Sequence, residues 1–162
     1  MSVASSRQKL EDALAYVCEK YPHKPELSKA RVTKMIYLAD WKSCLQYGSQ
    51  ISSIDWKFNH YGPYVDDATD VARSSTLLHL VETENMYGRA KTLISRSDAP
   101  FDPEQSSLTP QDVWCLDTVI EETKRLYWSD FISLVYGTYP VKTQPRLSIL
   151  DLPKLADEAQ RN

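Results

Sequence analysis

The hydrophobic pattern of residues 31–46 predicts a helix that is apolar on every side. At about 100° per residue, one face carries Val32, Met35, Ile36 and Ala39, and the other faces carry Tyr37, Leu38, Trp41, Cys44 and Leu45. A surface helix shows one apolar stripe, whereas a helix that is apolar all round is covered by several neighbours. We therefore expect this helix to lie at the centre of the fold, with Ser28 as its N-cap and Gly48 at its C-terminal end.

Amphipathic patterns on both sides of this segment predict four further helices, at residues 7–21, 64–74, 109–127 and 131–138. The third of these begins at Thr109-Pro110, a favourable helix start, and Pro140 is expected to stop the fourth. The buried stripes are expected to consist of Leu10, Leu14, Val17, Cys18 and Tyr21 in the first helix and Val113, Leu116, Ile120 and Tyr127 in the third.

Two stretches alternate in the way that strands do. Residues 51–61 place Ile54, Trp56 and Phe58 on one face, and Gly62-Pro63 is expected to form a rigid turn after them. Residues 77–97 are typical of a β-hairpin whose turn lies within residues 85–89. Residues 145–153 predict an irregular tail that docks on the core through Leu147, Ile149, Leu150 and Leu152.

These elements predict a mainly α (α+β) fold, a compact helical domain around a central buried helix with a small β-hairpin. The 162 residues fit a single domain spanning 1–162, in which we expect residues 1–6 and 156–162 to be flexible.

Composition excludes several classes of function. The formal net charge of −3 argues against nucleic acid as the main partner, because phosphate binding requires clustered Lys and Arg. No apolar run approaches the roughly 18 residues of a membrane span, and residues 1–6 lack the pattern of a signal peptide, so we expect a cytoplasmic protein. Three widely spaced cysteines, Cys18, Cys44 and Cys115, are expected to be reduced core thiols.

Candidate catalytic and metal-binding groups are sparse. His23, His60 and His79 are scattered without metal-ligand spacing, and only 4 glycines are present, all isolated, so no phosphate-binding loop is formed. Asp66, Asp67 and Asp70 are typical of acids that favour a helix N-terminus on a solvated face. We therefore expect no catalytic residue, no metal and no cofactor.

Aromatic residues instead cluster around the Gly-Pro pair. Such residues either fill a core or form the rim of a protein-binding groove, where Tyr and Trp are enriched, and both uses are compatible. The candidate partner-binding site consists of Trp56, His60, Tyr61, Tyr64, Asp66, Asp67 and Asp70.

Three motifs in this order resemble the SocA-like or Panacea antitoxin domain family, which includes phage-associated GepA-like proteins. They are Val32-Thr33-Lys34-Met35-Ile36-Tyr37-Leu38-Ala39-Asp40-Trp41 with Tyr47-Gly48, then Trp56-Lys57-Phe58-Asn59-His60-Tyr61-Gly62-Pro63-Tyr64, and finally Leu134-Val135-Tyr136-Gly137-Thr138-Tyr139-Pro140. The resemblance covers about residues 10–140 and implies a mainly helical, non-enzymatic protein of a prophage-associated toxin–antitoxin system whose partner is a toxin protein.

Most members of that family are thought to bind their toxin directly, and one branch acts as a proteolytic adaptor that delivers the toxin to a protease. The leading hypothesis is therefore a toxin-binding antitoxin. A winged-helix-like DNA-binding regulator is the second hypothesis, since a helix at 64–74 followed by a hairpin with Arg89, Lys91 and Arg96 fits that layout. An enzyme without a recognisable motif is the third.

Overall fold

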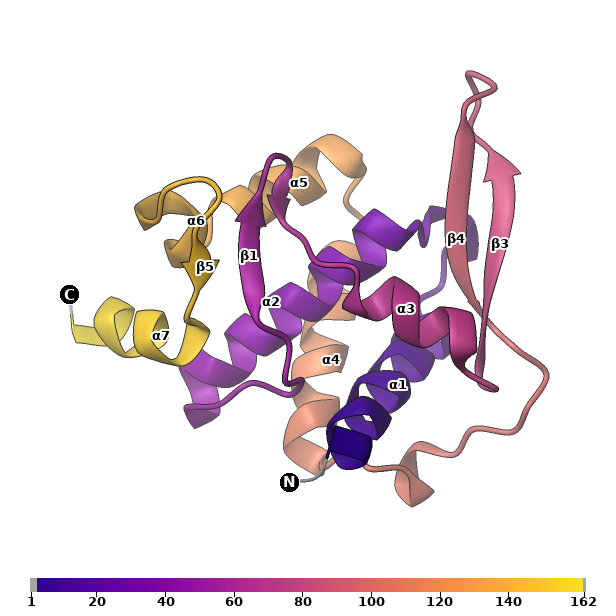
Figure 1. Cartoon of the computed structure of the whole chain (residues 1–162), viewed down its shortest axis with the longest axis horizontal. Coiled ribbons are helices and arrows are strands. Elements are labelled where there is room, and N and C mark those ends of the chain that lie inside the picture. Colours follow the sequence, from indigo (N-terminus) through magenta and orange to yellow (C-terminus); the bar gives the residue numbers. More distant parts are fainter. Residues whose placement is uncertain (1–2, 162) are drawn as a thin grey trace.

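A computed structural model describes residues 3–161, which form a mainly helical α+β fold (Figure 1). The elements in chain order are α1 (Val3–Lys20), the 3-10 helix η1 (Lys24–Glu26), α2 (Lys29–Tyr47), β1 (Trp56–Asn59), β2 (Gly62–Pro63), α3 (Asp67–Ser74), β3 (Leu78–Glu84), β4 (Ala90–Arg96), the 3-10 helix η2 (Pro103–Gln105), α4 (Pro110–Thr123), α5 (Trp128–Tyr136), α6 (Tyr139–Thr143), β5 (Ile149–Leu150) and α7 (Leu152–Arg161). The predicted fold class is confirmed.

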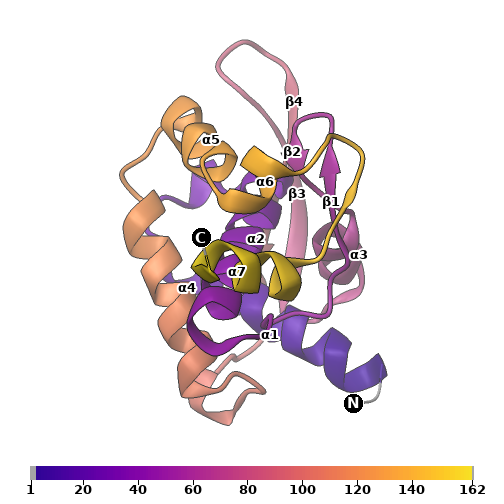
Figure 2. The same ribbon diagram turned by 90° about the vertical axis from the view of Figure 1, so that its left-hand side faces the viewer.

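Helix α2 crosses the middle of the molecule, as its sequence predicts (Figure 1). Every residue from 31 to 41 is buried, and α1, α3, α4 and α7 all pack against the helix. The Ser28 hydroxyl caps its first turn by accepting from Arg31 N at 3.1 Å. Gly48, with φ 84°, ends it in the left-handed conformation that favours glycine. In the side view of Figure 2, α4 and α5 lie to one side of α2, and β1 and α3 lie to the other.

Strand β1 is the middle strand of a small antiparallel sheet, between β2 and β5. The predicted alternation is confirmed, because Ile54, Trp56 and Phe58 are all buried. The expected turn at Gly62-Pro63 is wrong by two residues. The turn is His60–Tyr61, and Gly62–Pro63 returns alongside β1 as β2, because its backbone pairs with Phe58 and Asn59.

The predicted hairpin forms β3 and β4, which pair along seven residues each. Its turn is stabilised by Asn85, whose Oδ1 accepts from Tyr87 N at 2.9 Å and Arg89 N at 3.0 Å. Leu78 and Ile94 are buried at the base of the hairpin, while residues 81–90 are exposed, so the distal half projects from the body of the protein (Figure 1).

The third predicted helix ends earlier than its pattern suggests. Thr109 and Asp112 form a capping box at the start of α4, but the helix stops at Thr123. Tyr127, expected in the buried stripe, is 80% exposed and precedes α5. Pro140 does not end a helix but lies in the first turn of α6, where the missing N–H of proline has no partner to lose.

The tail is more regular than expected. Leu150 in β5 and Leu152 in α7 are buried, whereas Leu147 and Ile149 are exposed, contrary to the expectation that all four dock on the core. Residues 156–161 belong to α7, which packs against α2, and residues 3–6 belong to α1. Residues 1, 2 and 162, also expected to be flexible, lie outside the described residues.

The three cysteines are free and buried, as predicted. Burial raises the pKa of Cys18 to about 12, so this thiol stays protonated and unreactive at neutral pH. No helix in the described part of the chain is long and apolar enough to cross a lipid bilayer.

Candidate functional site

The His60–Tyr61 turn presents its side chains to solvent from a short, well-anchored hairpin. His60 is exposed, and Tyr61 is 82% exposed, which is unusual for so large an apolar ring. The Asn59 side chain accepts a hydrogen bond from His60 N at 3.0 Å. Gly62 has φ 99°, a conformation that L side chains rarely adopt.

The turn is held against α5 and the segment before β5. A Cβ on Gly62 would lie 3.2 Å from the ring of Tyr136, so a larger residue here would force that ring to move away. The rings of Phe58 and Tyr136 meet edge to face with centroids 6.2 Å apart, and the Arg146 guanidinium lies 5.3 Å from the Phe58 centroid. Phe58 N also donates to Ser148 O at 2.9 Å. These contacts fix the backbone that carries Tyr61.

Lys34 of α2 lies beneath the same hairpin. Its side chain is only 2% exposed, and its ammonium lies 5.3 Å from the centroid of the Tyr64 ring. No carboxylate among the described residues forms an ion pair with it. Burial therefore lowers the pKa of Lys34 to about 8. Tyr64, half-buried, serves in part to cover this charge.

Lys34→Met should stabilise the protein at pH 7, and the gain should shrink as the pH rises. Below about pH 8 the wild-type fold must bury a charged ammonium at full cost. Between pH 8 and the unfolded pKa of 10.5 the folded lysine is neutral while the unfolded one is still charged, so the cost falls steadily with rising pH and is lost near pH 10.5. Urea unfolding of both proteins at pH 7, 8, 9 and 10 measures the difference. Lys29→Met, an exposed position on the same helix, should show no such trend. A pH-independent gain in Lys34→Met would contradict the burial of its charge.

A buried aspartate positions the strand that leads into the turn. Asp40 of α2 is fully buried and accepts hydrogen bonds from Ile51 N, Ser52 N and the Trp56 indole, at 3.0, 2.9 and 2.9 Å, and further bonds from the Ser52 hydroxyl and Gln50. Loss of hydration raises its pKa to about 6, and the hydrogen bonds act in the opposite direction. Asp40 is therefore ionised at neutral pH and fixes residues 50–56 on the central helix.

The acidic residues gather at the start of α3. Asp66, Asp67 and Asp70 are exposed, and Asp67 and Asp70 line a groove of about 350 Å³ between α3 and α1. The pKa of Asp67 is raised, first by partial burial and then by the negative charges of Asp70, Asp55 and Asp66. Asp55 belongs to the same acidic cluster but is separated from it in sequence, so the local pattern did not indicate it.

The structure divides the predicted binding residues into three groups. Trp56 is fully buried and serves as a hydrogen-bond donor to Asp40, so it contributes no exposed surface, and its inclusion is wrong. His60 and Tyr61 form an aromatic tip. The three aspartates form an acidic patch, and Tyr64 lies in sequence between the tip and the patch. Strand β1 and helix α3 lie on the same face of the molecule (Figure 1).

Sequence reasoning missed a second surface. A groove of about 800 Å³ lies between the β3–β4 hairpin and the start of α5, and Met86, Tyr127 and Trp128 line it while remaining 87%, 80% and 49% exposed. The misplacement of Tyr127 in a buried stripe concealed this surface. No local signal separated Tyr127 from that stripe, because at helical spacing it shares a face with Leu116 and Ile120.

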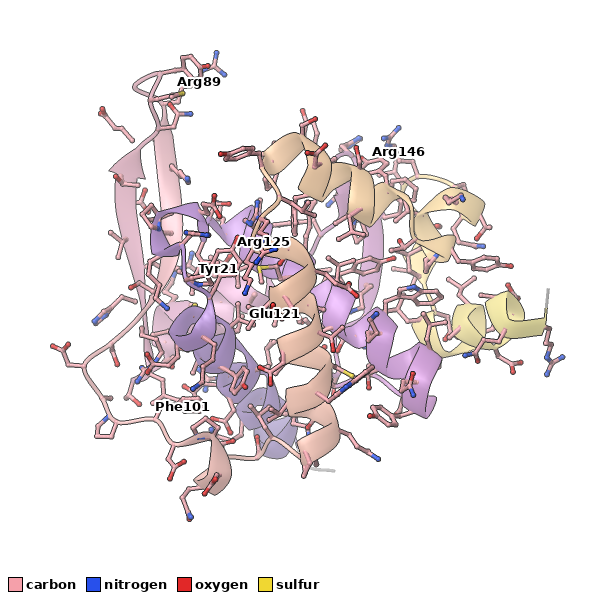
Figure 3. All side chains as sticks on the ribbon, turned by 180° about the vertical axis from the view of Figure 1, so that it is seen from behind. Tyr21, Arg89, Phe101, Glu121, Arg125 and Arg146 are labelled. Carbon is pink, nitrogen blue, oxygen red and sulfur yellow. The ribbon has the colours of Figure 1, made fainter. Side chains whose placement is uncertain are left out.

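Two of the three basic residues of the hairpin have structural roles. Arg96 donates to Ala99 O at 2.6 Å and pairs with Glu19 at 3.5 Å, and Lys91 donates to Pro25 O at 3.0 Å. Arg89 alone of the three lies at the exposed tip (Figure 3). Among the residues that the structure describes, no three His, Cys, Asp or Glu side chains gather closely enough to hold a metal ion.

Comparison with known families gives one match. The family described as antitoxin SocA-like, Panacea domain, matches residues 32–140, which is more than half of the chain and includes most of α2 and all of the β1–β2 hairpin, α3, β3, β4, α4 and α5. Neither the curated proteins nor the solved structures contain a match to the chain. The match spans the central helix, the anchored turn and the acidic start of α3, and the chain therefore belongs to the SocA-like antitoxin family with a Panacea domain.

Proposed function

We propose that this chain is a non-enzymatic antitoxin that neutralises a cognate toxin protein in the cytoplasm by direct one-to-one contact. Membership of the antitoxin family supports a toxin as the partner in general. The contact surface that we propose consists of the His60–Tyr61 tip, Tyr64 and the acidic start of α3.

The observation that carries this proposal is the exposure of Tyr61 on a fixed backbone. The ring is 82% exposed, while Gly62 beside it is buried against Tyr136 and Lys34. A side chain presented on a rigid turn loses little conformational entropy on binding, so it contributes more affinity for the same contact area. Tyrosine also combines an apolar ring with a hydroxyl that bonds well at an interface rim.

The acidic patch adds charge selectivity to this anchor. Asp66, Asp67 and Asp70 repel one another, and the presence of Asp55 strengthens the negative potential on this face. Such a patch accelerates encounter with a basic surface and disfavours acidic partners. We therefore propose that the toxin surface that meets α3 is basic.

Replacing Asp67 and Asp70 together with lysine should abolish rescue of cells that express the toxin, while the fold is preserved. Both side chains are exposed, and each such surface change alters the free energy of unfolding by about 0.5 kcal/mol or less. The toxin would be supplied from the neighbouring open reading frame, expressed alone and with each variant. Thermal unfolding is measured in parallel.

A matched control carries the same change of charge elsewhere. Glu121 and Glu122 are exposed on α4, which faces the viewer in Figure 3, on the side opposite to Figure 1. Glu121→Lys with Glu122→Lys should leave rescue intact. Rescue at wild-type level by the α3 variant would remove the acidic patch from the contact. Rescue lost in both variants would indicate a general effect of charge.

The amount of toxin in the rescued cells separates direct neutralisation from proteolytic delivery. An antitoxin that blocks its toxin by contact leaves the toxin present at its normal level, whereas an adaptor lowers that level in a protease-dependent way. An immunoblot of tagged toxin with and without the chain makes the distinction. DNA binding is disfavoured, because Lys91 and Arg96 are engaged within the fold and the start of α3 is acidic.

A further inference from the structure

The groove between the β3–β4 hairpin and the start of α5 is a separate surface with the features of a peptide-binding site. It encloses about 800 Å³, more than the groove beside α3, and it lies between the distal hairpin, of which both strands line it, and two aromatic side chains. Figure 1 shows β4 on one side of this space and α5 on the other. The groove has no part in the function proposed above.

The pairing of the hairpin determines which backbone groups of β4 face outward. Asn85 N donates to Arg89 O, so hydrogen-bonded pairs recur at every second residue along the two strands. The non-hydrogen-bonded pairs that alternate with these, including Glu82 with Thr92, direct their N–H and C=O groups away from the partner strand. Ala90, two residues before Thr92, is oriented in the same way.

Part of this outward edge is already paired. Ile94 N donates to Leu27 O at 2.9 Å, so the segment before α2 acts as a very short third strand. The chain then turns into α2 and leaves the rest of the edge. The N–H groups of Ala90 and Thr92 donate to none of the described residues. Ser28 also pairs with Leu93 as an isolated antiparallel bridge. An added strand could therefore continue from Ser28 along the distal half of β4.

The opposite wall is apolar and exposed. Tyr127 and Trp128 are 80% and 49% exposed, and Met86 closes the hairpin end of the groove at 87% exposed. The Trp128 ring is packed against Phe131, with centroids 5.8 Å apart, so it is held in place. Large apolar side chains that gather at one groove are typical of protein contact sites.

The floor of the groove carries a buried charge that lacks an acidic partner. Arg31 is 2% exposed, and its Nη2 donates to Tyr21 Oη, Thr123 O and Leu126 O, each at 2.9 Å. Its Nε is buried without a hydrogen-bond partner. Glu26 is linked to it only through the Tyr21 hydroxyl. A buried guanidinium is stabilised strongly by a carboxylate, and this one has none in direct contact.

The surrounding charges favour an acidic ligand over a basic one. Lys91 lines the groove and donates to a backbone carbonyl. Arg125, next to the end of α4 in Figure 3, is exposed and lines an adjoining groove that shares Glu26 and Tyr127 with this one. With Arg31 these are three cations without a direct ion pair among the described residues. They face two acids that line the groove, Glu26 and Glu84.

We infer that this groove binds an extended acidic segment of a partner protein, which adds as a strand to the distal half of β4, packs apolar side chains against Tyr127 and Trp128, and places an Asp or Glu carboxylate toward Arg31. The strand edge supplies affinity through the backbone, and the aromatic wall and the guanidinium supply specificity for side chains on alternate positions.

The test uses a display library of random seven-residue peptides, selected on the purified full-length chain. Enriched peptides should contain an Asp or Glu flanked by apolar or β-branched residues. The synthesised peptides should shift the amide resonances of Ala90 and Thr92, and Tyr127→Ser should weaken their binding about tenfold or more. A Glu→Gln change within a selected peptide should also weaken its binding to the chain.

Two proline variants then test strand addition directly. Thr92→Pro and Glu82→Pro remove outward N–H groups at the same rung, so neither removes a backbone hydrogen bond within the hairpin, and both remove the same side-chain bond from Thr92 Oγ1 to Glu82. Only Thr92 belongs to β4, the strand whose outward edge Leu27 already joins. Circular dichroism should show both folded. Peptide affinity should fall about fivefold or more in Thr92→Pro and stay unchanged in Glu82→Pro.

Three results would overturn the inference: no enrichment above a non-binding control, selected peptides without acids, or equal effects of the two prolines. Dimerisation of the chain that is lost in Tyr127→Ser would also overturn it, by assigning the groove to a second copy. Loss of toxin rescue in the α3 variant has no bearing on these outcomes, because that variant leaves the groove unchanged.

Discussion

Ile36→Asp should leave the domain unfolded under conditions in which the wild-type protein is folded. Ile36 lies in the middle of α2 and is 2% exposed, among residues that are all buried. Its replacement removes about 2 kcal/mol of apolar burial and introduces an unpaired charge that costs several kcal/mol. The sum is comparable to the whole stability of a domain, about 5–15 kcal/mol. Far-UV circular dichroism and urea titration measure the result.

Two controls separate the buried charge from a general sensitivity of the helix. Ile36→Val should cost only about 1 kcal/mol, because it removes one methylene group and adds no charge. Gln46→Asp, an exposed position on the same helix, should remain folded. A soluble Ile36→Asp protein with an unchanged Tm would show that α2 is not the centre of the fold.

Asp40→Ala should lower the free energy of unfolding by about 3–5 kcal/mol, since it leaves several buried donors without an acceptor. The loss includes the bonds from Ile51 N, Ser52 N and the Trp56 indole. We also expect the effect to be local, because these donors belong to the segment that leads into β1. Chemical denaturation measures the loss of unfolding free energy. Hydrogen exchange of the Trp56 indole and of residues 51–59 shows whether the loss is confined to this segment.

Asp40→Asn is the graded control for this prediction. It preserves the shape of the side chain but replaces one acceptor oxygen with a donor, so the loss should be smaller, about 1–3 kcal/mol. Asp55→Ala, an exposed aspartate of the same segment, should have little effect. Wild-type stability in Asp40→Ala would refute the role of Asp40 in fixing residues 50–56. If Asp40→Ala stays folded but loses toxin rescue, rigidity of the turn is required for binding.

The family, the central helix and its caps followed from local sequence. Thirteen of the residues in α2 are buried, and an all-round apolar pattern encodes that burial without knowledge of the neighbours. Ser28 and Gly48 act on backbone groups within a few residues of themselves. Such short-range effects depend little on the rest of the chain, which is why they were predicted correctly.

The surfaces depended on contacts between residues distant in sequence. Trp56 belongs to the aromatic cluster around the turn, yet Asp40, 16 residues earlier, takes its indole into the core. Tyr127 continues the stripe of α4 in the sequence, but the helix ends at Thr123. Arg31 of α2 donates to the carbonyls of Thr123 and Leu126 at this end. Periodicity states which residues share a helical face, whereas exposure also depends on which other elements reach that face. The sequence by itself therefore determined the central helix, the hairpin and the family. Only the tertiary structure decided which aromatic side chains are buried and which remain exposed for a partner, because that outcome is set by packing and hydrogen bonds between distant segments.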